Sequence, residues 1–135
     1  MTLVLRKCWK DGHSSDGFYY GKKGNVVASE NLYGLKEGNG AWHLLQGDTW
    51  LVFEVKSKII DYGDKCKFKT GKILFRGSTK QLAKSEFPHK LKLNEESAFQ
   101  WALNIGNKNI MSKKIKSEQC AYEWAKYIGN KSEMI

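Results

Sequence analysis

The sequence predicts an α+β protein in which an N-terminal, mostly antiparallel β-sheet or open barrel packs with a C-terminal set of short helices. Two observations predict this fold class. Residues 1–87 contain short stretches in which apolar and polar residues alternate between glycine-rich turns, as in antiparallel strands. Residues 88–135 carry apolar residues at helical spacing, in two similar segments.

The first part contains several strand-like segments. Thr49–Ser57 is the clearest strand, because it is β-branched and aromatic and alternates, with Trp50 and Glu54 on one face. Residues 64–77 hold two more strands, whose lysines face outward and whose Cys66 faces inward. The other expected segments are, in chain order, a strand at Leu3–Trp9, a turn at 11–17, two strands around a turn within 17–29, a loop at 31–40, a short helix or strand start at 41–45, and an edge or second strand at 58–63.

The period changes after these strands. Ser78 is a suitable N-cap for a short helix with Leu82 facing inward. Pro88 marks a boundary, so a linker is expected at 87–92. The predicted domains are a β-rich domain at 1–87 and a helical repeat segment at 88–135.

The helical segment repeats itself. AFQWALNIGNK at 98–108 and AYEWAKYIGNK at 121–131 are identical at seven of eleven positions. Each has apolar residues at helical spacing, including Trp101 and Trp124, and each ends in the pair Gly–Asn, which favours a helix stop. A short helix is expected between them, at 109–117. Because one unit cannot bury its own apolar face, we expect the two units to stack on each other and on the sheet.

The composition favours anionic partners. Lys and Arg total 23 against 14 acidic residues, a net charge of +9, and a positive field attracts nucleic acid, phosphorylated small molecules or an anionic membrane. Only Arg6 and Arg76 are arginines. Lysine as general solubilising charge is the alternative explanation.

Cysteine usage and hydropathy bear on the compartment. The three cysteines include no CxxC pair, so a disulfide framework is not expected. No secretory leader and no apolar run of membrane-spanning length is recognised. We therefore expect a cytoplasmic protein, in the host cell if phage-encoded, with no membrane partner and no cofactor. An edge strand and many aromatic residues would suit a homo-oligomer.

Five sequence pieces are similar, in order and spacing, to an uncharacterised β-rich domain of phage and bacterial proteins. Four lie in residues 11–87: DGFYYGKKG, YGLKEGNGAWHL, WLVFEVKS and DKCKFKTGKILFRG. The fifth is the helical unit, which resembles tandem repeats of about 22 residues with the pattern A-x-x-W/Y-A-x-x-I/V. Relatives often have His directly after the Gly-Leu pair, where this chain has Lys36 and places His43 seven residues later.

More distantly, the β-rich part resembles phage anti-defence sponges that sequester cyclic ADP-ribose signals of Thoeris immunity. The resemblance implies a small oligomeric protein that binds a nucleotide through Arg and aromatic side chains, without chemistry.

No standard catalytic motif is recognised, and His and Cys residues lack metal-ligand spacing. His43 follows Trp42 in a Gly-flanked loop and is a candidate phosphate donor or general acid, or else a packed histidine. Glu54 is either a catalytic carboxylate or the partner of a lysine in residues 64–69.

Arg76 precedes Gly77 at the expected helix start. An arginine amid so many lysines indicates a need for bidentate geometry toward phosphate or carboxylate. With Ser78 and Thr79 it forms a predicted phosphate corner; a structural Arg–Glu bridge is the alternative.

Lys65 and Lys67 belong to a basic stripe that is either a solvated strand face or a path for a nucleic-acid backbone. Tyr19, Tyr20 and Trp42 are the aromatic candidates for stacking on a base. The candidate ligand-binding residues are therefore Arg76, Ser78, Thr79, His43, Trp42, Tyr20, Lys65 and Lys67.

The leading hypothesis is a protein that sequesters a phosphorylated small molecule, such as a nucleotide immune signal, without chemistry. A basic nucleic-acid-binding protein is the main alternative, followed by a nucleotide-processing enzyme using His43 or Glu54 and a protein-docking inhibitor using the helical repeats.

Overall fold

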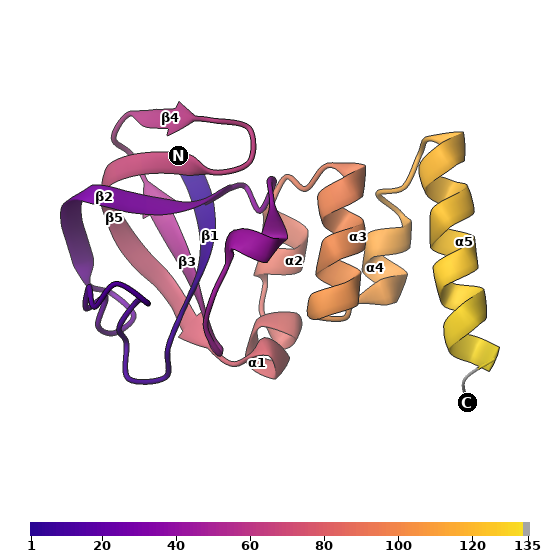
Figure 1. Cartoon of the computed structure of the whole chain (residues 1–135), viewed down its shortest axis with the longest axis horizontal. Helices are drawn as coiled ribbons and strands as arrows, with labels where there is room; N and C mark the ends of the chain where they lie inside the picture. Colours follow the sequence, from indigo (N-terminus) through magenta and orange to yellow (C-terminus); the bar gives the residue numbers. More distant parts are fainter. Residues whose placement is uncertain (134–135) are drawn as a thin grey trace.

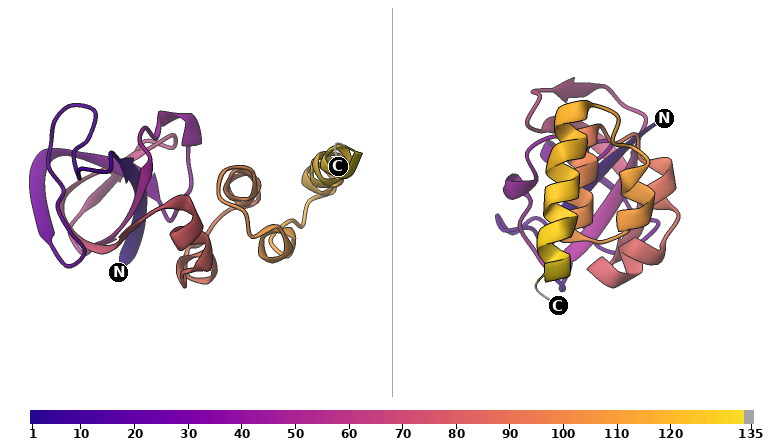
Figure 2. Two further views of the ribbon diagram at one scale, coloured as in Figure 1. Left: turned by 90° about the horizontal axis from the view of Figure 1, so that it is seen from below. Right: turned by 90° about the vertical axis from the view of Figure 1, so that its right-hand side faces the viewer.

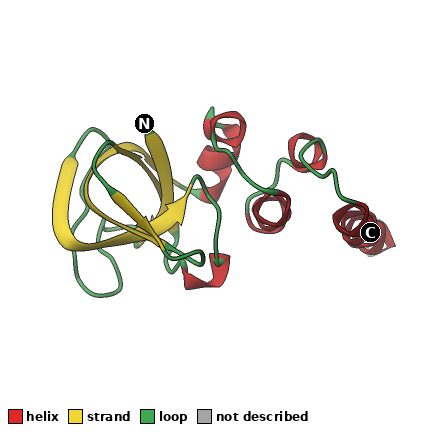
Figure 3. Cartoon of the chain, turned by 90° about the horizontal axis from the view of Figure 1, so that it is seen from above, coloured by secondary structure: helices red, strands yellow, loops and turns green. Residues whose placement is uncertain are grey.

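The computed structural model describes the backbone of residues 1–133 and the side chains of residues 1–127. It confirms the α+β fold class (Figure 1). The strands are β1 (Thr2–Cys8), β2 (Val26–Lys36), β3 (Thr49–Val55), β4 (Ile59–Asp61) and β5 (Cys66–Gly77). They form an antiparallel sheet in the order β2-β1-β3-β5-β4, and β2 also pairs with β5. This last pairing closes the sheet into a ring (Figure 3) instead of leaving an open barrel.

The C-terminal helices follow one another away from the ring (Figure 2). They are α1 (Thr79–Lys84), α2 (Phe87–Lys90), α3 (Glu95–Asn104), α4 (Lys108–Ser112) and α5 (Glu118–Glu133). A 3-10 helix, η1 (Trp42–Leu44), lies between β2 and β3 in the chain. No helix in the part of the chain that the structure describes is long and apolar enough to cross a membrane.

Successive side chains of β3 point to opposite faces of the sheet, and both faces are buried. Leu51 and Phe53 face the interior of the ring, whereas Trp50 and Val52 face the helices. The Trp50 side belongs to an apolar cluster that extends through Leu82, Phe87 and Trp101 to Trp124. The boundary predicted at residue 87 stays a prediction, and this cluster crosses it.

Several segments differ from expectation. The two strands expected in 64–77 are the single strand β5, and the first of the two strands expected within 17–29 is only an isolated bridge between Tyr19 and His13. Residues 31–36, expected in a loop, are the second half of β2, because Gly34 lets the backbone pass close to β1: a Cβ built there lies 2.4 Å from Val4 Cγ1. The expected linker at 87–92 instead begins with α2, whose Phe87 and Pro88 are buried. The predicted cap is confirmed, since Ser78 and Gln81 form a reciprocal capping box on α1.

The first repeat unit ends through a specific hydrogen-bond arrangement. Asn107 adopts a left-handed φ of 61°, and its side-chain oxygen accepts from the Trp101 indole N–H at 2.9 Å. Its amide nitrogen donates to the Ala83 carbonyl of α1 at 3.0 Å. In the first unit, the spacing of Trp101 and Asn107 thus stops the helix, gives the buried indole a hydrogen-bond partner and links the unit to α1.

The second unit differs from the first. Its Gly–Asn pair at 129–130 lies inside α5, so the predicted helix stop there is wrong. Trp124 is buried against Phe99 of α3, with ring centroids 5.8 Å apart, as the stacking of units requires. Ala121 and Ala125 are exposed, and the side chain of Ile128 lies outside the described residues.

Candidate functional site

The better-enclosed of two pockets lies beside β1 and β2, and we call it the Tyr33 pocket. Its volume is about 340 Å³, within the range of small-molecule sites. Its lining combines cations, an aromatic ring and an apolar wall: Arg6, Lys7, Ser15, Asp16, Tyr33, Gly34, Leu35, Leu44, Leu45, Gln46 and Lys65.

Arg6 is held in place by the sheet. Its Nη1 donates to the Tyr33 carbonyl at 2.8 Å, and its guanidinium carbon lies 5.1 Å from the centre of the buried Tyr20 ring. Its Nε is buried and has no hydrogen-bond partner among the described residues. A buried donor without a partner is costly, and a ligand that accepts a hydrogen bond from it would remove that cost.

Two lysine ammonium groups lie near the aromatic ring of Tyr33. Lys65 Nζ lies 4.8 Å from the ring centre and Lys67 Nζ lies 5.9 Å from it. Both lysines come from the β4–β5 side, and Lys67 is the cross-strand partner of Tyr33. The ring therefore orients two of the lysines that the sequence predicted as ligand-binding.

The remaining charges of the pocket are Lys7 and Asp16. Lys7 Nζ lies 4.4 Å from the centre of the Trp50 ring, and partial burial lowers the pKa of its ammonium. The Ser14 hydroxyl donates to Asp16 and lowers the pKa of that carboxyl, with a smaller contribution from Arg6. The lining thus presents three cations and one carboxylate to a ligand.

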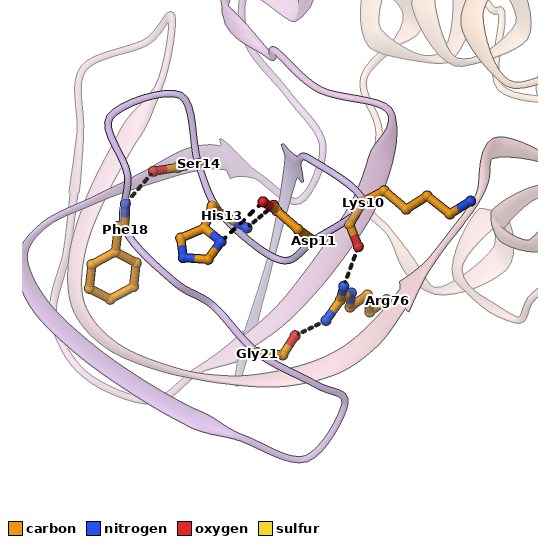
Figure 4. Close-up of polar contacts among 7 residues, drawn as sticks. All are labelled: Lys10, Asp11, His13, Ser14, Phe18, Gly21 and Arg76. Carbon is orange, nitrogen blue, oxygen red and sulfur yellow. Dashed lines mark hydrogen bonds and ion pairs between the residues drawn. The ribbon is translucent and has the colours of Figure 1, made fainter.

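The second pocket holds the predicted phosphate corner, and we call it the Arg76 pocket. It is more open, with a volume of about 610 Å³. Arg76 and Ser78 line it, but the Thr79 hydroxyl accepts from the Trp50 indole at 2.9 Å and serves the core. Arg76 makes no Arg–Glu bridge; it donates to the carbonyls of Lys10 and Gly21, at 2.6 Å each (Figure 4).

The other predicted residues lie elsewhere. Trp42 and Tyr20 are core residues, exposed by 7% and 2%, so neither ring can stack on a base. His43 is exposed on η1 and lines neither pocket. Glu54 pairs with Lys56, Nζ to Oε1 at 3.3 Å, and not with a lysine of 64–69. The residues predicted as one site are therefore divided between two pockets and the core, and His43 and Lys67 line neither pocket.

No cysteine is among the residues that line the Tyr33 pocket. Cys66 lies in the core, where burial raises the pKa of its thiol to about 11. No group of His, Cys, Asp and Glu residues suited to a metal ion is found among the described residues.

Sequence reasoning missed Arg6 and Tyr33. The scarcity of arginine pointed equally to Arg6 and Arg76, and only the latter was taken up. Tyr33 was assigned to a loop because of the three glycines nearby, so its place opposite Lys67 was not anticipated.

Comparison of the chain with protein-family models, with curated proteins and with solved structures found no match.

Proposed function

We propose that the protein binds a nucleotide or similar phosphorylated small molecule in the Tyr33 pocket and holds it without converting it. The observation that carries the proposal is the buried, unpaired Nε of Arg6 in a pocket lined by two further cations, Lys7 and Lys65. Arginine and lysine donors side by side are the groups that bind phosphate oxygens in proteins.

The apolar residues of the lining support a ligand with an apolar or planar part. They are Leu35, Leu44 and Leu45, which line the pocket together with Tyr33. A phosphate alone would gain nothing from these residues, whereas a nucleotide would place its base against them and its phosphate at the cations. Asp16 could accept a hydrogen bond from a ribose or from an exocyclic amine, and it repels a phosphate placed beside it.

Sequestration agrees with the pocket's residues. The lining contains cations and an aromatic ring but no histidine that could activate the Ser15 hydroxyl, and this favours tight holding over turnover. The resemblance to anti-defence sponges supports the same class of activity and is the source of the proposal that the ligand is an immune signal.

The test is to purify the protein from cells rich in nucleotides, denature it by heat and identify the released molecules by mass spectrometry. We expect a stoichiometric, intact nucleotide. Lys65→Gln should lower the occupancy strongly, and Arg6→Lys, which keeps the charge but loses the planar fork, should do the same.

The matched control is Lys69→Gln, because Lys69 lies in β5, shortly after Lys65 in the chain, pairs with Glu30 and does not line the pocket. Equal occupancy in the Lys65 and Lys69 variants would refute the site. A chemically converted nucleotide would refute holding without conversion, and an empty wild-type protein would refute the proposal.

A further inference from the structure

The Arg76 pocket gathers more positive charge than the Tyr33 pocket and shares no lining residue with it. Its lining is Lys10, Lys22, Lys23, Asp48, Thr49, Arg76, Gly77, Ser78 and Gln81. Four of these nine side chains are cations and one is a carboxylate.

Arg76 joins the two segments that carry the lysines. One nitrogen of its guanidinium donates to the carbonyl of Lys10, after β1, and the other to that of Gly21, at the start of the next turn (Figure 4). A residue of β5 thus fixes the backbones of both lysine-bearing turns side by side. Because a guanidinium has five N–H donors, three remain after these two bonds.

The turn that carries two of the lysines is anchored at its other end as well. The Gly24 N–H donates to the Ile73 carbonyl at 2.8 Å, and the Asn25 N–H closes the turn onto Lys22 at 3.1 Å. Gly21 and Gly24 have φ values of 82° and 95°, which only glycine adopts without strain. These hydrogen bonds therefore hold the backbone of Lys22 and Lys23 in a fixed position.

These lysines have no acidic partner. The ammonium groups of Lys10, Lys22 and Lys23 make no hydrogen bond or ion pair within the described part of the chain, although Lys56, Lys69 and Lys90 all do. The single carboxylate of the pocket, Asp48, accepts a hydrogen bond from the Thr49 hydroxyl. Holding four cations together in this way costs electrostatic free energy that a multiply charged anion would offset.

We propose that the Arg76 pocket is a second anion site, which binds a chain of linked phosphates. The side-chain oxygens of Ser78 and Gln81 accept backbone N–H groups in the capping box, and the Thr49 hydroxyl donates to Asp48, so the four cations dominate recognition. Charge-based recognition favours an anion with several charges over a single phosphate. The open shape of the pocket admits a chain whose remainder extends into solvent, whether free inorganic polyphosphate or the triphosphate of a nucleotide.

The test uses inorganic tripolyphosphate as the probe in calorimetric titrations at low ionic strength. We expect Lys22→Gln combined with Lys23→Gln to weaken its binding about tenfold, since each exposed charge pair contributes up to about fivefold. The control is Lys113→Gln combined with Lys116→Gln, which removes the same charge from exposed positions outside both pockets. Arg76 itself is left intact, because its loss would release both turns.

The outcomes separate the explanations. If both double variants lower the affinity for tripolyphosphate equally, then binding depends only on the overall positive charge, and the proposal is overturned. An absence of tripolyphosphate binding to the wild-type protein would overturn it as well. Stronger competition by a single-stranded oligonucleotide than by tripolyphosphate would assign the surface to nucleic acid and also overturn it. Repeating the titrations in a Lys65→Gln background weakens any tripolyphosphate binding to the Tyr33 pocket, so the two sites can fail independently. Adenosine triphosphate, compared with tripolyphosphate, distinguishes a nucleotide source from a free polyphosphate.

Discussion

The side chain of Asn107 should stabilise the folded protein by several kcal/mol, although it is a polar residue at a helix end. Asn107→Ala removes the bond to the Trp101 indole and the bond to the Ala83 carbonyl, each worth about 1 kcal/mol. Trp101 is fully buried, so its unpaired N–H adds about 1 kcal/mol more. Alanine at a φ of 61° adds about 1 kcal/mol of strain. The expected loss is about 3–4 kcal/mol.

Urea denaturation followed by far-ultraviolet circular dichroism measures this loss. Asn107→Gly provides an internal comparison, because glycine removes the same hydrogen bonds without the backbone strain, so it should be more stable than Asn107→Ala by about 1 kcal/mol. Asn104→Ala is the control, since Asn104 bonds only to Gln100 on the exposed surface of α3.

A stabilising role for the Asn107 side chain is refuted if the free energy of unfolding of Asn107→Ala lies within about 0.5 kcal/mol of the wild-type value, which is the range of ordinary surface substitutions. Equal stability of the alanine and glycine variants would remove the strain contribution and leave the hydrogen bonds as the whole effect.

Gly34→Ala should lower the stability by about 3 kcal/mol, because the new Cβ would lie 2.4 Å from Val4 Cγ1 and 2.9 Å from the Leu5 carbonyl oxygen; a thermal midpoint equal to that of the wild type would contradict the close strand approach. Stability should also fall in alkali, because burial raises the pKa of the Cys66 thiol to about 11 and that of the Tyr20 phenol to about 12. The unfolded chain releases these two protons at lower pH than the folded protein does, so deprotonation favours unfolding. The contribution of both groups to the free energy of unfolding is complete below about pH 9. It is lost as the pH rises toward 12, by about 1.4 kcal/mol per pH unit and group. Denaturation curves across this range check it, and Cys66→Ala should flatten the fall between pH 9 and 11.

The alternation of Thr49–Ser57 was sufficient to predict a central strand, and Ser78 was sufficient to predict the start of α1. Both are local signals, set by side-chain period and by backbone capping. Gly34 misled the prediction of β2, because a glycine needed for close strand approach looks in sequence like a glycine needed for a turn. Pro88 misled it similarly, since proline is also tolerated in the first turn of a helix.

The candidate site was less predictable for a different reason. The pockets depend on which segments meet when the ring closes, and no local pattern reports that Arg6 reaches Tyr33 or that Arg76 reaches Lys10 and Gly21. The rarity of arginine did indicate a geometric role for Arg76, and the same signal was available for Arg6. Whether an aromatic ring stacks on a ligand or fills the core is also decided by tertiary burial, as for Tyr20.

The side-chain bonds of Asn107 have a consequence for how such a chain can change in length. They reach back to Trp101 in its own unit and to Ala83 in the helix before it, and they involve no residue of either pocket. A duplication of one unit, with its boundary after the Asn, would leave the lining of both pockets unchanged. The helical segment is therefore where this architecture can gain length without altering either pocket.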